Sequence, residues 1–390
     1  MDRSDRVLIT GATGFIGGRL VEMLAAQGVR MRIATSDLSH CSRVARFPVE
    51  LVKADLVDHE ALARAAEGCS VIFHFGYRFG GSPKEQQRVN VEGTRALAEA
   101  LLKNGGRRFI HISSVSAYGA PRDGDLTEDT PPLPTADAYS NTKQKIERLL
   151  LDLHRTHGLP VAIIQPTIVY GPYGSTWTVR LLEQVRSCRI VLPAGGLGLC
   201  NAVYVDDVVV ASMLAVERAA AVGETFLISG AVPVTWREFY GAYEKMLGKR
   251  ALLELDDAQT YVEEVRQRKE GLLSRQIMVG LSRRPAFRKR LLGLPPQSWL
   301  LAAGQRLLPS PVQAAIGRRY ESLWQSPSDA AAVSLPVYLP DPGSRALYSA
   351  RTHVRIDKAT NKLGFKPAFD LDSGMALTTE WARWANLTSK

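Results

Sequence analysis

A glycine-rich turn near the N-terminus constrains the fold of this 390-residue chain more than any other feature. Gly11, Gly14 and Gly17 follow an apolar run at residues 6–10 and open a segment with helical spacing at residues 15–27. Glycines allow a tight strand-to-helix turn, and they let a phosphate approach the N–H groups at the helix N-terminus, where the helix dipole favours anions. The turn therefore predicts a βαβ unit that binds the pyrophosphate of a dinucleotide.

Short apolar runs alternate with helical patterns over the first 170 residues or so. The runs predict buried parallel strands at residues 6–10, 31–34, 51–53, 71–75, 109–113 and 161–165. The clearest helical patterns between them are residues 15–27, 90–103 and 138–157. This alternation predicts an α/β fold with a doubly wound parallel sheet, a Rossmann fold.

The regular alternation ends near residue 171, which indicates a second, smaller domain. We assign residues 1–175, with 203–230 returning to them, to a Rossmann domain that binds NAD(P). Residues 176–202 and 231–390 form the predicted substrate domain, which carries a proline-broken helical insertion at 265–324. Further expected elements are helices at 176–186, 206–217 and 235–247, strands at 201–205 and 225–228, and a final helix with Trp381 and Trp384.

The net positive charge of the chain is confined to this insertion. The formal net charge is +10, and residues 265–324 contain twelve basic and two acidic residues, so the segment holds the whole excess. Such confinement argues against nucleic acid as a partner. Because the segment is also rich in apolar residues, two hypotheses stay open: a substrate lid with a solvated basic face, or peripheral contact with an anionic membrane.

Cysteine usage and hydropathy point to a cytoplasmic protein. The four cysteines are scattered and include no Cys-x-x-Cys pair, so we expect neither a disulfide framework nor a metal site. We find no signal peptide and no run of about 18 uncharged apolar residues. The expected location is cytoplasmic, with membrane association only if residues 265–324 contact a membrane.

Several motifs in a fixed order resemble one protein superfamily. They are TGATGFIG (10–17), Asp55-Leu56, FHFG (73–76), NVEGT (90–94), HISSVSAYG (111–119), YSNTK (139–143), PTIVYGP (166–172) and a weaker block, IDKATNKLGFKP (356–367). Over residues 5–230 their order and spacing resemble the extended short-chain dehydrogenases/reductases, in the NAD-dependent epimerase/dehydratase group. The resemblance implies an enzyme that transfers hydride between NAD(P) and a secondary alcohol or ketone, for net redox or for epimerisation.

The resemblance also implies a set of cofactor-binding residues. They are Gly11, Thr13, Gly14, Phe15, Ile16, Gly17, Thr35, Ser36, Asp55, Leu56, Phe75, Gly76, Asn90, Ser113, Tyr139, Lys143, Pro166, Thr167 and Ile168. The residue that ends the second strand usually selects the cofactor, since an acid favours NAD and an arginine favours NADP. Thr35 and Ser36 tolerate either one, Asp37 comes two positions late, and Arg43 lies a little beyond, so we expect a slight preference for NADP(H).

Tyr139 and Lys143 lie one turn apart on a predicted helix, so their side chains share a face. A tyrosine with a pKa of about 10 is a poor base at pH 7. A lysine about 4 Å away, at an effective dielectric of about 20, contributes roughly 4 kcal/mol, which corresponds to about 3 pKa units. We therefore expect Lys143 to lower the pKa of Tyr139, which would exchange a proton with the substrate hydroxyl. By resemblance, Ser114 hydrogen-bonds the reacting oxygen, with Ser113 and Ser116 close by.

Departures from the family pattern bear on the substrate. Val115-Ser116 replaces the Asp-Glu pair of dehydratases, so a dehydratase is not expected. Ile168 and Cys200 stand where nucleotide-sugar epimerases commonly carry Asn and Arg. The resemblance gives the substrate residues as Ser114, Ser116, Tyr170 and Arg351, with Arg345 as an alternative to Arg351.

Three functions remain open. The first is an epimerase or oxidoreductase of a nucleotide-activated sugar, the commonest use of the superfamily. The second is a reductase of a larger apolar, sterol-like or lipid-like alcohol or ketone, favoured by the missing Asn and Arg and by the insertion. The third is a non-catalytic NADP(H) sensor, against which Tyr139 and Lys143 argue. By analogy, the protein forms a homodimer through helices 90–103 and 138–157.

Tyr139→Phe is expected to retain cofactor binding and to abolish turnover, because the phenyl ring has no proton to exchange. Titration calorimetry with the cofactor and an assay of substrate turnover measure the two effects. Unchanged turnover in this variant would contradict the assignment of Tyr139.

Overall fold

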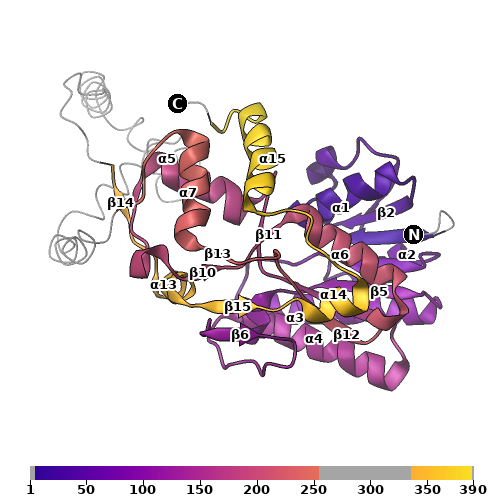
Figure 1. The fold of residues 1–390 in the computed structure, drawn as a ribbon. Helices are drawn as coiled ribbons and strands as arrows, with labels where there is room; N and C mark the ends of the chain where they lie inside the picture. Colours follow the sequence, from indigo (N-terminus) through magenta and orange to yellow (C-terminus); the bar gives the residue numbers. More distant parts are fainter. Residues whose placement is uncertain (1–4, 254–334, 389–390) are drawn as a thin grey trace, which may run out of the picture. The chain divides into compact units, whose positions relative to one another are not determined.

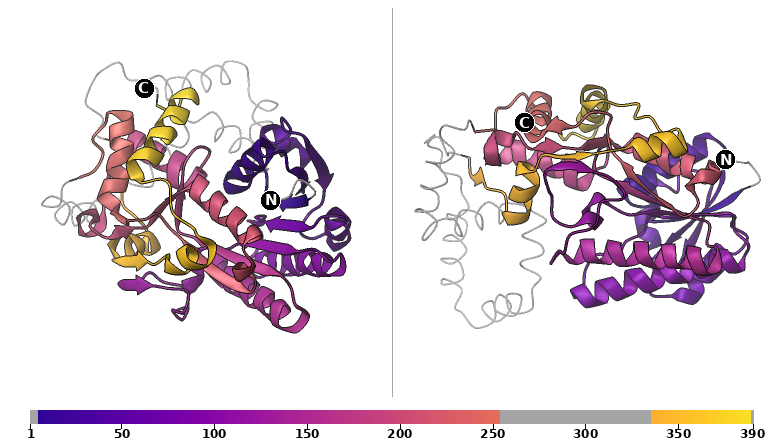
Figure 2. Two further views of the ribbon diagram at one scale, coloured as in Figure 1. Left: turned by 45° about the vertical axis from the view of Figure 1, so that its right-hand side comes forward. Right: turned by 60° about the horizontal axis from the view of Figure 1, so that its bottom comes forward.

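The computed structural model describes residues 5–253 and 335–388 of the chain (Figures 1 and 2). The chain divides into two units, residues 1–252 with 337–390 and residues 253–336. The predicted insertion at 265–324 lies outside the described residues, so the lid and membrane hypotheses stay predictions. Within the described part, no helix combines the length and the apolar character needed to span a membrane.

Seven parallel strands form the central sheet of the first unit (Figure 1). They are β1 (Arg6–Thr10), β2 (Arg30–Thr35), β3 (Val49–Lys53), β4 (Val71–His74), β5 (Arg108–Ile112), β7 (Val161–Pro166) and β12 (Glu224–Ile228). The strand order is β12-β7-β5-β4-β1-β2-β3, and every neighbouring pair is parallel. The predicted doubly wound α/β fold is confirmed. The order reverses between β1 and β4, which is where such sheets bind ligands.

Alternating side chains divide the strands between two hydrophobic cores, because successive residues of a strand point to opposite faces. In β1, Val7 and Ile9 belong to one core and Leu8 to the other. The first core is covered by α1 (Phe15–Ala26) and α6 (Val205–Glu217), and the second by α2 (His59–Ala66), α3 (Pro83–Lys103) and α4 (Ala138–His157) (Figure 2). Helices on both faces are what an all-parallel sheet requires.

Two helices differ from their predicted bounds. Helix α3 begins at Pro83 and not at residue 90, because the Ser82 hydroxyl accepts a hydrogen bond from the N–H of Glu85 at 3.2 Å and Pro83 suits a first turn. The predicted helix at 176–186 is a π-helical turn (Ser175–Val179) followed by α5 (Arg180–Ser187). The N–H of Val179 reaches back five residues to the carbonyl of Gly174 at 2.8 Å, which is the π-helical bond.

The remaining elements pair segments that lie far apart in the sequence. The small sheets join β8 (Ile168–Tyr170) to β11 (Ala202–Tyr204), β10 (Leu199–Cys200) to β13 (Val234–Thr235), β9 (Arg189–Ile190) to β14 (Val337–Tyr338), and β6 (Gly124–Leu126) to β15 (Thr352–Val354). The other helices of the described residues include α7 (Trp236–Leu247), α13 (Pro342–Ser349), α14 (Asp357–Leu363) and α15 (Leu371–Trp384).

The C-terminal segment returns to the last strand of the central sheet. Helix α14 packs on β12 and α6. In α6, the carboxylate of Asp207 accepts hydrogen bonds from the N–H groups of Ala368 at 2.8 Å and Phe369 at 3.3 Å. Lys358 of α14 forms an ion pair with Glu224 of β12 at 2.7 Å. These contacts fasten the segment that carries β15 and α15 to the Rossmann sheet.

The turn between β1 and α1 brings three backbone segments into contact. Gly11 has a φ of +70°, and a Cβ there would lie 2.5 Å from the carbonyl carbon and oxygen of Phe75. A Cβ on Gly17 would lie 2.3 Å from the carbonyl oxygen of Gly11. Only glycine permits both approaches, so the turn, the first turn of α1 and the end of β4 meet with no side chain between them.

Gly11→Ala is expected to destabilise the protein more than the matched control Gly28→Ala. Gly28 has a φ of +71°, but a Cβ there meets no atom within 4 Å, so the control carries only left-handed strain, about 1 kcal/mol. At Gly11 a backbone clash adds to this strain, and we expect a loss of roughly 3 kcal/mol. Urea unfolding followed by circular dichroism measures both, and equal losses would contradict the close approach.

Candidate active site

A cavity of about 430 Å³ opens at the carboxyl ends of β1 to β4, and we name it the adenosine cavity after the part of the cofactor that is expected there. The predicted cofactor residues that line it are Gly11, Thr13, Thr35, Ser36, Asp55, Leu56 and Gly76. Next to this turn, α1 begins with Phe15, Ile16 and Gly17 after an extended Gly14, and no side chain caps its N-terminus. Uncapped N–H groups and the helix dipole suit a pyrophosphate, so these residues fit an adenine dinucleotide.

Tyr139 and Ser114 meet where α4 begins and β5 ends. Tyr139 lies in the first turn of α4 because Asp137 caps the helix and accepts a hydrogen bond from the N–H of Ser140 at 2.8 Å. Ser114 follows β5 and hydrogen-bonds Tyr139. The same hydroxyl accepts hydrogen bonds from the N–H and the hydroxyl of Ser116, at 3.1 and 3.0 Å. The structure thus brings two of the predicted catalytic residues into direct contact.

Burial controls the protonation of Tyr139 and Lys143. Lys143 is only 3% exposed, and burial lowers its pKa to about 8. Its Nζ donates a hydrogen bond to the Ile112 carbonyl at 2.7 Å and lies 5.7 Å from the centroid of the Tyr139 ring. Burial raises the pKa of Tyr139 to about 12, although the hydrogen bond with Ser114 acts to lower it. A net lowering of the Tyr139 pKa is therefore not seen in this geometry, because burial outweighs the hydrogen bond with Ser114 and the Lys143 ammonium group is bound to the Ile112 carbonyl.

Two aromatic side chains that the sequence analysis missed pack on Tyr139. The Phe79 ring is nearly parallel to the Tyr139 ring at a centroid distance of 6.0 Å, and Tyr77 meets that ring edge-on at 5.0 Å. Asn90, a predicted cofactor residue, holds their loop: it accepts a hydrogen bond from the N–H of Arg78 at 2.8 Å and donates one to the Arg78 carbonyl at 3.0 Å. Asn90 therefore positions the loop after β4 and does not line the adenosine cavity.

The wall of a second cavity of about 400 Å³, the Tyr139 cavity, has six hydroxyl-bearing residues among those described: Ser114, Ser116, Tyr118, Tyr139, Thr167 and Thr352. Its apolar lining residues include Val115, Leu126, Ile168, Trp177, Leu199, Trp236, Leu347 and Val354. Arg122 is the one cation among the described lining residues. Its guanidinium donates hydrogen bonds to the backbone carbonyls of Tyr118 at 2.8 Å and Pro131 at 3.2 Å.

Comparison with known proteins identifies the family. The model of the NAD dependent epimerase/dehydratase family matches residues 7–229. The chain belongs to this family. Its resemblance to UDP-glucose 4-epimerase of Mycolicibacterium smegmatis reaches 33% identity over 264 residues, which is 62% of this chain and 83% of the epimerase.

Other members of the epimerase/dehydratase family show the breadth of its substrates. The 4-hydroxy-2-methyl-3-oxo-4-farnesyl-3,4-dihydroquinoline-1-oxide ketoreductase of Stigmatella aurantiaca is 25% identical over 238 residues, covering 60% of this chain and 71% of the ketoreductase. The crystal structure of UDP-glucose 4-epimerase with UDP-glucose from Thermotoga maritima superposes with a TM-score of 0.66 at 20% identity, covering 98% of this chain and 99% of that one. The structural likeness confirms the fold, whereas the sequence relatives include both an epimerase and a ketoreductase.

Two of the predicted substrate residues, Tyr170 and Arg351, do not line the Tyr139 cavity. Tyr170 is buried, and its hydroxyl donates a hydrogen bond to the Asp370 carbonyl at 3.2 Å. Arg351 is exposed and does not line the cavity, and the alternative Arg345 is exposed as well. The structure therefore brings Ser114 and Ser116 together but not Tyr170 or Arg351.

The other predicted cofactor residues have identifiable positions. Ser113 is buried, and its hydroxyl donates a hydrogen bond to the Glu147 carboxylate, away from both cavities. Phe75 lies against the Gly11 turn, and Pro166 ends β7. Thr167 and Ile168 line the Tyr139 cavity rather than the adenosine cavity.

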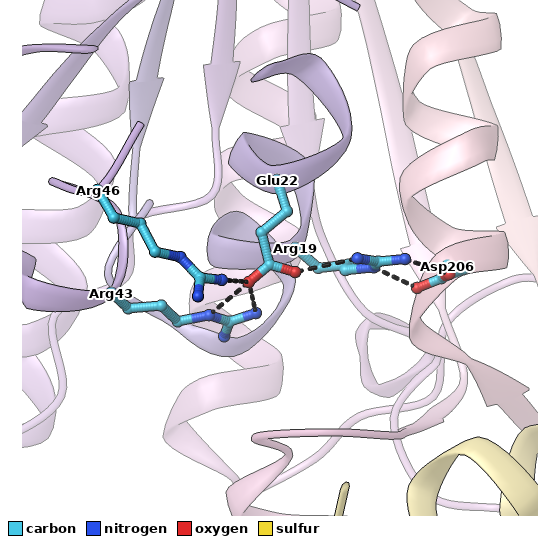
Figure 3. A network of polar contacts seen from close by, with 5 residues as sticks. All are labelled: Arg19, Glu22, Arg43, Arg46 and Asp206. Carbon is cyan, nitrogen blue, oxygen red and sulfur yellow. Dashed lines mark hydrogen bonds and ion pairs between the residues drawn. The ribbon is translucent and has the colours of Figure 1, made fainter. Parts of the chain in front are cut away.

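Arg43 belongs to a charge network and does not line the adenosine cavity (Figure 3). Glu22 of α1 accepts hydrogen bonds from Arg43 at 2.9 and 3.0 Å and from Arg19 at 3.0 Å. Arg19 in turn donates two hydrogen bonds of 2.7 Å to Asp206 of α6. The Arg43 guanidinium also stacks 3.9 Å from the centroid of the Tyr173 ring. Because Glu22 and Tyr173 already bind the Arg43 guanidinium, Arg43 adds no support to the expected NADP preference.

Arg78→Gln is expected to weaken the binding of NADP(H) more than that of NAD(H). Arg78 lines the adenosine cavity with Thr35 and Ser36, and its Nη1 lies 3.4 Å from Asp55 Oδ1. A cation beside the ribose can pair with a 2′-phosphate, so we expect the Kd for NADP(H) to rise about tenfold. Titration calorimetry with both cofactors measures the ratio of the two affinities.

Arg43→Gln is the matched control for this measurement. It removes the same charge from a guanidinium that Glu22 and Tyr173 already bind, so the affinity ratio should stay unchanged. A change of that ratio in Arg43→Gln, with none in Arg78→Gln, would reverse the assignment.

Proposed function

We propose that this protein is an NAD(P)(H)-dependent oxidoreductase that interconverts a ketone and a secondary alcohol on an apolar substrate. The observation that carries the proposal is the wall of the Tyr139 cavity, where Tyr139 and Ser114 lie among Trp177, Trp236 and Leu347. Contact with such a wall stabilises a bound apolar substrate, by about 25 cal/mol for each Å² of apolar surface that is buried. A mostly apolar cavity with a few polar groups is typical of a small-molecule site.

The protonation states support proton donation by Tyr139 during reduction. Because burial raises the pKa of Tyr139 to about 12, its phenol is protonated at neutral pH. The phenol can then donate its proton to the carbonyl oxygen of a ketone, while Ser114 orients that oxygen by a hydrogen bond. A bound nicotinamide cofactor supplies the hydride that the carbonyl carbon accepts. The charge of Lys143 stabilises the tyrosinate that remains.

A nucleotide-activated sugar, the first hypothesis from the sequence, is the second candidate. The specific observation in its favour is the 33% identity to the UDP-glucose 4-epimerase of M. smegmatis. Against it, a diphosphate needs cations to replace its hydration. Arg122 is bound to backbone carbonyls, and Arg345 and Arg351 do not line the Tyr139 cavity. The geometry of the described residues, 5–253 and 335–388, therefore supports the apolar ketone better.

A dehydratase and a non-catalytic sensor receive less support. Asp137 is the one carboxylate among the described lining residues of the Tyr139 cavity, and it is bound to the N–H and the hydroxyl of Ser140 at 2.8 and 2.6 Å. It is therefore committed to capping α4 and is poorly placed to remove a substrate proton. Burying the charge of Lys143 costs free energy of folding. A non-catalytic sensor would not need this buried lysine near Tyr139, whereas an enzyme uses it in proton transfer.

Cofactor preference, assembly and location belong to the same proposal. The family is NAD-dependent, and the slight preference for NADP(H) now rests on Thr35, Ser36 and Arg78. A homodimer would use α3 and α4, which pack side by side along one face of the sheet (Figure 2). A cytoplasmic location and peripheral membrane contact through residues 265–324 stay predictions.

The purified chain is expected to oxidise NADPH or NADH when an apolar ketone is added. Across a series of ketones of increasing alkyl length, kcat/KM should rise about fourfold per methylene until the cavity is filled. The absorbance of the reduced nicotinamide measures the rates. Epimerisation of UDP-glucose without reduction of any ketone would favour the second candidate instead.

Trp177→Ala tests the wall of the Tyr139 cavity. Removing this ring should raise KM for the longest ketones more than for the shortest, because it takes away apolar contact at one part of the wall. Trp384→Ala is the matched control, since Trp384 is 87% exposed and does not line the cavity. Equal effects of the two variants on KM would contradict the proposed substrate site.

A further inference from the structure

A carboxylate that the proposed reaction does not use lies next to Lys143. Glu147 follows Lys143 by one turn of α4. Its Oε1 accepts hydrogen bonds from the Ser113 hydroxyl and from Gln165 Nε2, the latter at 2.8 Å. Ser113 and Gln165 are 3% and 2% exposed, so the partly buried carboxylate is held by buried partners at the end of β5 and in β7.

Hydrogen bonds connect this carboxylate to the wall of the Tyr139 cavity. Tyr118 lines that cavity, and its hydroxyl donates a hydrogen bond to Gln165 Oε1 at 2.9 Å. The amide nitrogen of the same Gln165 donates to Glu147. Both the oxygen and the nitrogen of the Gln165 amide are therefore hydrogen-bonded, which fixes the orientation of the amide. Glu147 is linked to the cavity wall as well as to the helix of Lys143.

Lys143 lacks any other counter-charge in its immediate surroundings as the structure describes them. Its one hydrogen-bond acceptor is the neutral Ile112 carbonyl, and burial of an ammonium group without an opposite charge is strongly unfavourable. Burial lowers the pKa of His74 to about 3 and that of His111 far below its ordinary value, so both rings are uncharged near neutral pH. The charge of Glu147 raises the pKa of Lys143 against the effect of burial.

We propose that Glu147 is a positioning residue: its carboxylate lies one turn along α4 from Lys143 and is bound to Ser113, next to the Ile112 carbonyl that binds Lys143, and it keeps the Lys143 ammonium group charged so that Lys143 can assist Tyr139 into the alkaline pH range. The kinetic consequence rests on the proposed function, whereas the effect of the Glu147 charge on Lys143 does not. Glu147 lines neither cavity, so we expect it to act on the reaction through Lys143. Ser113, just after β5, and Gln165 in β7 both donate hydrogen bonds to its carboxylate.

The charged and titratable groups around this pair come from several elements. They are Arg148 on α4, His74 in β4, His111 in β5, Tyr77 after β4, Tyr118 at the end of the 3-10 turn η2 (Val115–Tyr118), and Tyr139. The histidines are neutral, and burial raises the pKa of each of these tyrosines, so these too are neutral near pH 8. Arg148 is exposed and acts on Glu147 from the solvent side.

Glu147→Gln tests the charge at nearly constant volume. Because the carboxylate raises the pKa of Lys143, its removal lowers that pKa, and Lys143 loses its proton at a lower pH. The alkaline limb of the kcat–pH profile should therefore move down by about one pH unit, with little change in KM at slightly acid pH. Glu147→Asp retains the charge and should bring the limb back to its wild-type position, even if kcat is reduced.

Asp152→Asn is the matched control on the same helix. Asp152 is exposed and pairs with Arg155, so its loss removes one negative charge from α4 without touching the interior. The alkaline limb should stay in place in this variant. A shift as large as that of Glu147→Gln would mean that the overall charge of the helix matters and would overturn the inference.

A second measurement needs no enzymatic activity. The 13Cε resonance of Lys143 in the full chain, assigned with Lys143→Met, should titrate at lower pH in Glu147→Gln than in the wild type. In the wild type it should also respond at the acidic pH where Glu147 titrates, a test that holds even if Glu147→Gln does not fold. An identical Lys143 titration in both proteins, the absence of that second response, or a uniform loss of kcat at every pH would overturn the inference. If the wild type reduces no ketone, the proposed function fails while this titration still decides the role of Glu147.

Discussion

The parallel direction of seven strands is the constraint on which the rest of the structure depends. Because all seven strands run the same way, their carboxyl ends lie at one edge of the sheet, and the residues that follow them form the cavities. The order reverses between β1 and β4, so Gly11 and Gly76 line a single crevice. The same edge carries Ser114 after β5 and Thr167 after β7. Cofactor and substrate residues are thus gathered by strand direction, whatever their separation along the chain.

Some of the polar side chains gathered at this edge, such as Tyr139 and Lys143, are also buried. Burial is then the largest influence on their pKa values. From the spacing of Tyr139 and Lys143 alone, a single cation at close range lowers the pKa of the phenol. The folded chain adds desolvation, which disfavours the charged form of each group and therefore raises the pKa of Tyr139 while it lowers that of Lys143. A protonated phenol beside a buried lysine suits proton donation to a ketone. The Ile112 carbonyl accepts a hydrogen bond from this lysine, and the charge of Glu147 opposes the effect of burial on its pKa.

The sequence predicted the adenosine side of the site better than the substrate side. Residues at or just after the carboxyl end of a strand, such as Gly11, Thr35 and Asp55, line the adenosine cavity, because a loop after a parallel strand can only emerge at that edge. No comparable rule predicts which residues form the wall of the Tyr139 cavity. Trp177, Trp236 and Leu347 come from three separate elements, and no motif or spacing relates them. Aromatic residues in the glycine-rich loop directly after β4 were the one available signal for Tyr77 and Phe79, which pack on Tyr139.

By itself, the sequence determined the Rossmann sheet, the glycine turn and the placement of Tyr139 and Lys143 on one helix, because strand alternation, helical spacing and turn chemistry act over a few residues. Only the tertiary structure decided that Arg43 is bound by Glu22 and Tyr173, that Tyr170 and Arg351 stand apart from the Tyr139 cavity, and that this cavity is mostly apolar. These outcomes depend on which distant side chains become neighbours and on how much water each one loses. Neither quantity is set by local spacing, since both arise only when the strands and the C-terminal segment pack together.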